Sequence, residues 1–209
     1  MVEYIEKESN FNIFEKIFYS IFKPEMFFEK IKSENFSSTF FYLLFISSIT
    51  LSLQIILFYI GIKFNPNDNI IKFFENFVGT ISLSFLATGV FHVFAKIFGG
   101  KSNYRGTYQA YVYGFTVTNF LVWVPYIGSI SVIYGVYVFI KGISTIHEIS
   151  AGKAFLSWFT PILIITIILL VLFLIVGVAI FSYIAGIYYA NPEMLNSLET
   201  TGNFLKTIL

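Results

Sequence analysis

The sequence WVPYIG at residues 123–128 divides a long, almost uncharged tract, residues 104–146. As one helix this tract would be roughly 60 Å long at about 1.5 Å per residue, twice the thickness of a bilayer's hydrocarbon core. Proline and glycine interrupt helices, and tryptophan and tyrosine favour membrane interfaces. We therefore predict two spans, residues 104–124 and 127–147, joined by a tight turn.

The composition supports a membrane environment for the rest of the chain. Charged residues make up 12% of the 209 residues and hydrophobic residues 56%. A soluble domain carries about 25% charged residues, so this chain has too few to cover a water-facing surface. A span needs about 20 mostly apolar residues, and the tracts 36–62, 76–98 and 155–190 also qualify. We predict an all-α fold, a polytopic integral membrane helical bundle with five transmembrane helices.

The last tract, residues 155–190, is longer than one span requires. It can tilt, kink near Pro161 or Gly177, or project past the membrane. The alternative is a re-entrant second piece, which would make six segments in the membrane domain, residues 36–190.

The positive charges predict the orientation. Lysine and arginine number 13, and loops rich in them stay in the cytosol. A cytosolic N-terminus places ten inside: Lys7, Lys16, Lys23, Lys30, Lys32, Lys96, Lys101, Arg105, Lys141 and Lys153. It leaves three outside: Lys63, Lys72 and Lys206. We therefore expect a short extracytosolic tail at residues 191–209.

The cytosolic N-terminal arm, residues 1–35, contains an amphipathic pattern. Apolar side chains recur at helical spacing, opposite mostly polar ones, and Pro24 can open a second helix. We predict interfacial helices that lie on the cytosolic membrane surface. The predicted membrane-surface anchors are Phe11, Phe14, Ile17, Phe18, Ile21 and Phe22. The alternative is a helix packed on protein.

Small residues recur at helical spacing in the last three predicted spans. In lipid, such residues let helix backbones approach closely, so they are candidates for helix packing. They are Gly106, Ala110, Gly114 and Thr118, then Gly128, Gly135 and Gly142, then Ser182 and Gly186. Packing within one chain is the first interpretation, and packing between copies is the second.

No catalytic, cofactor or metal site is expected. The chain lacks cysteine, and its two histidines do not form a zinc motif. The net charge of +1, without a basic block, gives no sign of nucleic-acid binding. His92 is the candidate intramembrane polar residue, since an ionisable group in a span is often functional. The alternative is that His92 reaches the interface by snorkelling.

Four further stretches follow one another in a recognisable order. Residues 23–31 contain the pattern Pro-x-x-Phe-Phe, and residues 104–115 contain an aromatic-glycine step. Val124-Pro125 with the glycine-spaced fourth span comes next, and residues 147–155 come last. In this order the stretches resemble the start, the third and fourth spans and the last loop of the Yip1 domain family, over about residues 20–175.

The resemblance implies five spans and a cytosolic N-terminus. Eukaryotic relatives act in vesicle traffic between endoplasmic reticulum and Golgi, and bind prenylated Rab-type GTPases and sister proteins. Their Asp-Leu-Tyr-Gly-Pro motif is absent here and the N-terminal arm is short, which puts GTPase binding in doubt. The chain looks closer to prokaryotic members.

The favoured function is therefore a non-enzymatic membrane scaffold, related to membrane trafficking or organisation. Its expected partners are the lipid bilayer and either itself or another membrane protein. The alternative is a small-solute transporter or channel. A closely packed bundle favours the scaffold, whereas a polar path between spans favours transport. The predicted spans contain no Asp or Glu, which ion-coupled transporters usually bury.

Overall fold

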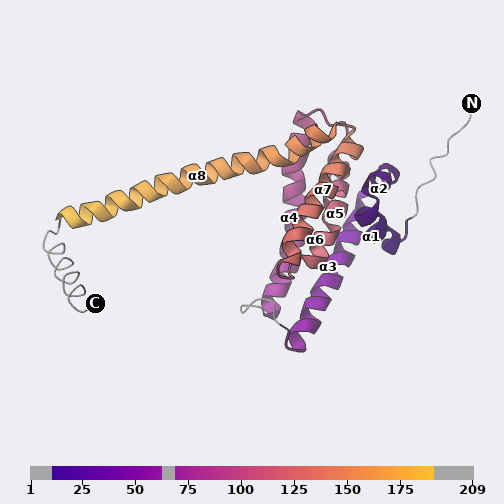
Figure 1. The fold of residues 1–209 in the computed structure, drawn as a ribbon, viewed down its shortest axis with the longest axis horizontal. Helices are drawn as coiled ribbons and strands as arrows, with labels where there is room; N and C mark the ends of the chain where they lie inside the picture. Colours follow the sequence, from indigo (N-terminus) through magenta and orange to yellow (C-terminus); the bar gives the residue numbers. More distant parts are fainter. Residues whose placement is uncertain (1–10, 63–68, 191–209) are drawn as a thin grey trace, which may run out of the picture. The chain divides into compact units, whose positions relative to one another are not determined.

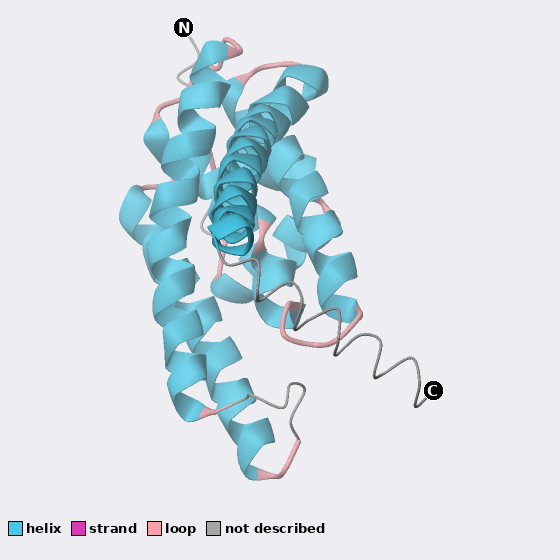
Figure 2. Cartoon of the chain, turned by 90° about the vertical axis from the view of Figure 1, so that its left-hand side faces the viewer, coloured by secondary structure: helices cyan, strands magenta, loops and turns pink. Residues whose placement is uncertain are grey.

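The computed structural model describes residues 11–62 and 69–190, and the regular elements in these residues are all α-helices (Figure 2). This confirms the predicted all-α class for that part of the chain. The predicted tail at 191–209 and the first ten residues of the arm lie outside the described residues. The helices are α1 (Ile13–Phe22), α2 (Pro24–Lys30), α3 (Phe36–Tyr59), α4 (Ile70–Ile97), α5 (Tyr104–Gly114), α6 (Thr116–Leu121), α7 (Ile127–His147) and α8 (Ala151–Ala190).

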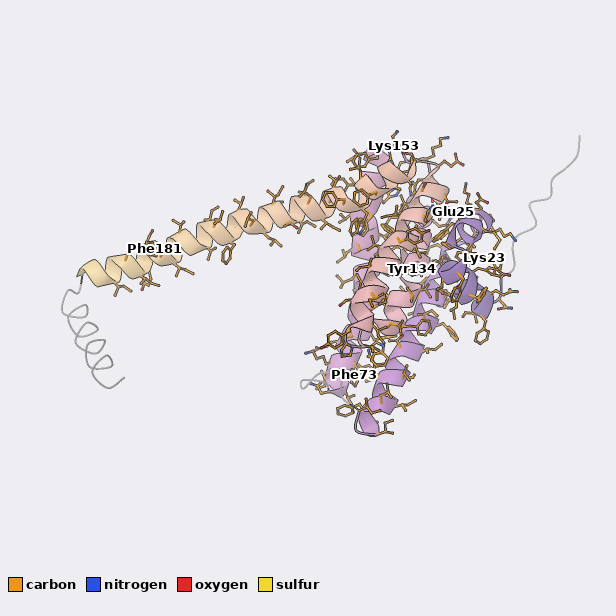
Figure 3. The ribbon with its side chains drawn as sticks, viewed as in Figure 1. Lys23, Glu25, Phe73, Tyr134, Lys153 and Phe181 are labelled. Atoms are coloured by element: carbon orange, nitrogen blue, oxygen red, sulfur yellow. The ribbon has the colours of Figure 1, made fainter. Side chains whose placement is uncertain are left out.

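The chain divides into two compact units, residues 1–161 and 162–209. The first unit holds α1 to α7 and the start of α8. In it, α5 packs between α4 and α7, α3 packs on α4 and α5, and α2 packs on α7 (Figure 1). Lys153 lies at one end of this bundle and Phe73 at the opposite end (Figure 3).

Asparagine begins four of the helices. The side chain of each accepts a hydrogen bond from the backbone N–H three residues later, which satisfies a donor that the helix itself leaves unpaired. The four caps precede α1, α3, α4 and α5: Asn12, Asn35, Asn69 and Asn103. Because Asn69 caps α4, the helix starts before the predicted span at 76–98 and includes Glu75.

The turn between α6 and α7 falls on the sequence WVPYIG. Helix α6 ends at Leu121 and α7 begins at Ile127. Tyr126 has φ of 63°, a left-handed value that is uncommon for a residue other than glycine. This conformation reverses the chain within a few residues, so α6 and α7 pack against each other directly.

The predicted third span, residues 104–124, is divided at Phe115 into α5 and α6. Four helices in the described residues are long and apolar enough to cross a membrane: Phe36–Tyr59, Ile70–Ile97, Ile127–His147 and Ala151–Ile187. Neither α5 nor α6 reaches that length by itself. The break is mild, because Phe115 N–H still bonds the Tyr111 carbonyl at 3.0 Å.

The core of the first unit lies where α2, α3, α5 and α7 meet. Its rings make close contacts: Phe27 and Tyr113 stand 5.0 Å apart edge to face, and Tyr42 and Tyr113 lie 4.6 Å apart. Such aromatic pairs add to the energy of burial. The largest buried side chains are Phe27, Phe28, Tyr42, Tyr108, Tyr113 and Phe139.

Helix α8 runs through Pro161 and Gly177 as one helix. Its part in the second unit is apolar, and the described side chains at 162–187 are exposed or half-buried. A second re-entrant segment is therefore not present in the described part of this tract.

Candidate functional site

Gly114 lies at the closest approach of α5 and α7. A Cβ atom added there would stand 2.8 Å from Phe139 Cα and 2.9 Å from its backbone nitrogen. Backbone atoms cannot move aside as the end of a side chain can. The absence of a side chain at 114 therefore lets these two helices touch.

Two glycines of α7 receive side chains from other helices. A Cβ atom at Gly142 would stand 2.8 Å from the Phe28 ring and 3.0 Å from the Ala110 Cβ atom. One at Gly135 would stand 3.0 Å from the Phe115 ring. Thr118 lies beside Gly135 and donates to the Ser131 carbonyl at 2.8 Å. Helix α7 thus presents a row of glycines, against which α2, α5 and α6 pack.

The remaining predicted packing positions differ in their surroundings. Gly106 lies against Ser102 and Ile146, and Gly128 lies against the Val122 carbonyl in the turn before α7. Ser182 and Gly186 lie on α8 in the second unit, where both are exposed. A packing role for these two stays a prediction.

The six predicted surface anchors divide into two groups. Phe14, Phe18 and Phe22 form one outward stripe on α1, with side chains 74%, 51% and 66% exposed. Phe11 and Ile17 instead pack against the core of the bundle. The sixth anchor, Ile21, is half-buried.

Helix α2 packs on protein. Phe27 and Phe28 are fully buried, and the Phe28 ring fills the space that Gly142 leaves open. The Tyr134 hydroxyl donates to the Ile21 carbonyl at 2.5 Å, and Glu25 forms an ion pair with Lys141. These contacts attach the hairpin of α1 and α2 to the side of α7 (Figure 3).

A polar cluster around Glu34 joins the N-terminal hairpin to α3 and α5. Lys16 forms an ion pair with Glu34, and the two side chains are only 12% and 13% exposed. The Tyr113 hydroxyl donates to Glu34 Oε2 at 2.8 Å, and the Gln109 amide donates to the Glu34 carbonyl at 2.7 Å. Sequence reasoning missed this cluster because its members lie far apart in the chain and share no motif.

The chain's two histidines meet at one threonine. Thr107 Oγ1 lies 2.7 Å from His92 Nδ1 and 2.8 Å from His147 Nε2. Both distances are within hydrogen-bond range. The threonine hydroxyl can donate its hydrogen to one ring nitrogen and accept a hydrogen bond from the N–H of the other ring. Thr107 of α5 thus gives His92 a hydrogen-bond partner inside the bundle. His92 does not have to reach the membrane interface to find one.

The loop after α4, at the Lys153 end of the bundle, is fixed by close contacts. Gly99 has φ of 91°, and a Cβ atom at Gly100 would stand 2.5 Å from His147 Nδ1. Lys101 donates to Glu148 at 3.1 Å and lowers the pKa of that carboxyl group below its usual range; Lys32 also contributes. Gly99, Gly100 and Lys101 therefore hold this loop against the end of α7.

A family model described as the Yip1 domain matches residues 18–174, more than half of the chain. The chain belongs to the Yip1 domain family. The comparisons with curated proteins and with solved structures give no match. The matched residues begin within α1 and end within α8, so the Yip1 domain includes the second half of α1, α2, the core and the histidine pair. Membership and the four apolar helices make the chain a multi-pass integral membrane protein.

The residues that the structure describes contain no candidate metal site. In the described ranges, no group of three or more His, Cys, Asp or Glu side chains is placed to hold a metal ion. At the Lys153 end of the bundle, Lys101 pairs with Glu148, and Thr107 joins His92 to His147. Their arrangement serves to hold helices together.

The Yip1 domain also contains an open groove between α3, α4 and α6, which α5 also lines, with a volume of about 520 Å³. Hydroxyl and amide side chains stand among apolar ones along its wall, and Leu43 and Val112 are its most buried lining residues. From Gln54 to Leu43 the groove follows α3 for roughly 16 Å at about 1.5 Å per residue. Sequence reasoning missed it because its polar residues come from three separate helices.

Proposed function

We propose that the chain is a five-span, non-enzymatic membrane scaffold that organises partner proteins or shapes the bilayer. In this proposal α5 and α6 together make the third span. The hydrogen bond from Asn119 N–H to the Phe115 carbonyl, at 2.9 Å, carries the helical pattern past the break. Both helices pack along α7, which supports treating them as one crossing.

The proposed orientation has a cytosolic N-terminus and an extracytosolic C-terminus. It rests on the ten-to-three distribution of lysine and arginine between the two sides. The bundle end that holds Lys101, Lys153 and Glu148 is then cytosolic.

The observation that carries the scaffold proposal is the attachment of the N-terminal hairpin. The largely buried Lys16–Glu34 pair, the Phe28 ring and the Tyr134 hydrogen bond fix the hairpin to the bundle. The stripe of Phe14, Phe18 and Phe22 remains exposed on it. A rigid, outward aromatic surface suits docking into lipid or onto another membrane protein.

Photo-crosslinking in native membranes tests the scaffold. A photoreactive amino acid replaces Phe18, and in a matched variant it replaces Ser33, which is exposed outside the stripe. We expect discrete protein adducts from position 18 and not from position 33. A position-18 variant that yields no protein adduct and leaves vesicle shape unchanged on reconstitution would contradict the scaffold.

The second candidate is a small-solute transporter or channel, and the groove between α3, α4 and α6 is the observation that favours it. Leu43 and Val112 line it and are each about 1% exposed, so they are packed against the core. Packed apolar side chains in the lining support the scaffold over an open path. Solute entry into liposomes that contain the purified chain, lost when Asn119→Leu fills the groove, would favour transport.

A further inference from the structure

The two histidines and Thr107 form a hydrogen-bonded bridge between three helices. His92 lies on α4, Thr107 on α5, and His147 is the last residue of α7. His147 is fully buried, and its Nδ1 atom has no hydrogen-bond partner among the described residues. Gly100, in the loop after α4, lies against that atom. His147 therefore has one ring nitrogen in the bridge and the other packed against the loop.

One assignment of hydrogens leaves no N–H group of His147 without an acceptor. His147 carries its hydrogen on Nε2 and donates it to Thr107 Oγ1, because a hydrogen on Nδ1 would have no acceptor. The Thr107 hydroxyl then donates its own hydrogen to His92 Nδ1. In this arrangement both rings are neutral and the bridge is complete.

An added proton disrupts the bridge whichever ring receives it. On His92 Nδ1 it places a second N–H donor opposite Thr107 Oγ1, and the threonine hydrogen then loses its acceptor. On His147 Nδ1 it places a charged N–H group where no described residue accepts a hydrogen bond. A buried donor without an acceptor is costly, and a charged one more so.

The surroundings of the bridge also disfavour positive charge. The centroids of the two histidine rings lie 5.9 Å apart, so two protonated rings would repel each other. Lys96, one turn after His92 on α4, adds a positive charge that acts on both rings. From α5, Tyr104 meets the His92 ring edge to face, and its hydroxyl donates to the Phe85 carbonyl. Tyr104 therefore offers no negative charge to the bridge.

Glu148, the residue after His147, does not compensate a charge on the bridge. Its exposed carboxylate pairs with Lys101 at 3.1 Å and with Lys32 at 3.6 Å. Among the described residues, no carboxylate forms an ion pair with either histidine. The bridge is therefore stable only while both rings are neutral.

We propose that the His92–Thr107–His147 bridge is a proton-sensitive latch, which holds α4, α5 and α7 together at neutral pH and releases them in acid. The loop after α4 is released with it, because the Lys101 N–H bonds the His147 carbonyl at 3.1 Å and Gly100 packs on the His147 ring. The latch is separate from the hairpin on which the scaffold proposal rests.

The pH range of the latch follows from the unfolded chain. An exposed histidine has a pKa of about 6.5, so the unfolded chain binds protons as the pH falls through this value, whereas the folded bridge resists them. The stabilisation is therefore full above this pH and is lost below it. The chain has two histidines and no cysteine, so both histidines that titrate in this range belong to the bridge.

Thermal unfolding of the full chain in detergent, at about pH 7.5 and about pH 5.5, tests the latch. We expect the midpoint to fall by roughly 3–10 °C at the lower pH. The matched variant is His92→Asn with His147→Gln. Its amide groups stand near the two bridging nitrogens, can donate and accept hydrogen bonds, and do not titrate. The midpoint of this double variant should be the same at both pH values.

Hydrogen exchange, corrected for intrinsic rates, locates the change. In the unaltered chain the amides of residues 99–107 should exchange faster at the lower pH, and those of residues 48–58, in the second half of α3, should not. Equal midpoints for the unaltered chain, or full pH dependence in the double variant, would overturn the proposal. If the double variant does not fold, unchanged exchange at residues 99–107 would overturn it. These outcomes do not depend on the crosslinking at Phe18.

Discussion

At the scale of single residues, Gly114 sets the distance between α5 and α7. Replacing it by alanine puts one carbon atom within 2.8 Å of the Phe139 backbone, so the helices must separate. Overpacking of this kind costs about 1–3 kcal/mol. We expect Gly114→Ala to lower the thermal midpoint of the purified chain in detergent.

The matched control for this change is Gly89→Ala on α4. An added Cβ atom there has no neighbour within 4 Å among the described residues. Alanine also favours helix over glycine. The control should melt at the same temperature as the unaltered chain or higher, and equal midpoints for the two variants would show that Gly114 is not a packing position.

Lys16 neutralises a carboxylate that is almost buried. Lys16→Met removes the positive charge and leaves Glu34 with hydrogen-bond donors alone. Breaking a buried ion pair costs about 3–5 kcal/mol, and the slight exposure of this pair places the expected loss at the lower end. We predict a lower thermal midpoint, measured in the same detergent.

A double substitution separates the ion pair from the packing of the lysine chain. Lys16→Met with Glu34→Gln leaves no buried charge, so it should be more stable than Lys16→Met alone. Lys23→Met, at an exposed position, serves as the control and should melt unchanged. A double variant as unstable as the single one would assign the loss to packing.

At the scale of elements, the outward stripe of α1 predicts contact with lipid. The chain has no cysteine, so a spin label can be attached at Phe18→Cys or Ser33→Cys alone. In vesicles that contain the purified chain without partner proteins, we expect oxygen, which concentrates in lipid, to relax the label at 18 more than a water-soluble nickel complex does. The label at 33 should show the reverse order.

Equal access of the nickel complex to both labels would place the stripe in water. Access of neither reagent to the label at 18 would show that protein covers the stripe.

Local signals predicted the helices and their turn well. Proline and glycine in the WVPYIG sequence mark the boundary between α6 and α7, and Pro24 opens α2. The break at Phe115 directly follows Gly114, a residue that disfavours helix, but the sequence analysis assigned this glycine to helix packing and placed no break there. The Phe115 ring also packs beside Gly135 of α7, a contact that a single sequence does not reveal.

The sequence predicted only those parts of the candidate site whose residues recur at regular spacing along one helix. Gly114 and Gly142 belong to regular small-residue patterns, and the structure places both at close approaches of helices. Glu34 with Tyr113, and His92 with His147, come together from distant parts of the chain. Such pairs depend on how the helices pack, so no local sequence pattern predicts them.

At the scale of the whole molecule, the charge distribution predicts which terminus is outside. Single cysteines at Ser33 and Asn203 can be labelled on intact cells with an impermeant maleimide. We expect label at 203, which lies outside the described residues, and none at 33. Label at 33, or equal label at both positions, would overturn the cytosolic N-terminus.

The short turn between α6 and α7 has a consequence for the surrounding bilayer. Helix α4 has 28 residues and α7 has 21, so they are roughly 42 Å and 32 Å long at about 1.5 Å per residue. The Lys101 N–H bonds the His147 carbonyl, so the two helices are level at that end. The α6–α7 turn then stops roughly 10 Å short of the start of α4.

The extra length of α4 is not apolar, because Lys72 and Glu75 lie in its first two turns. Charged side chains are costly among lipid tails, so we expect these turns to stand in the interfacial layer beyond the α6–α7 turn. The apolar heights of α4 and α7 are then similar, and the chain should show no preference for the thinner domain of a phase-separated vesicle. Fluorescence imaging of labelled chain in such vesicles measures this, and strong enrichment in the thinner domain would contradict it.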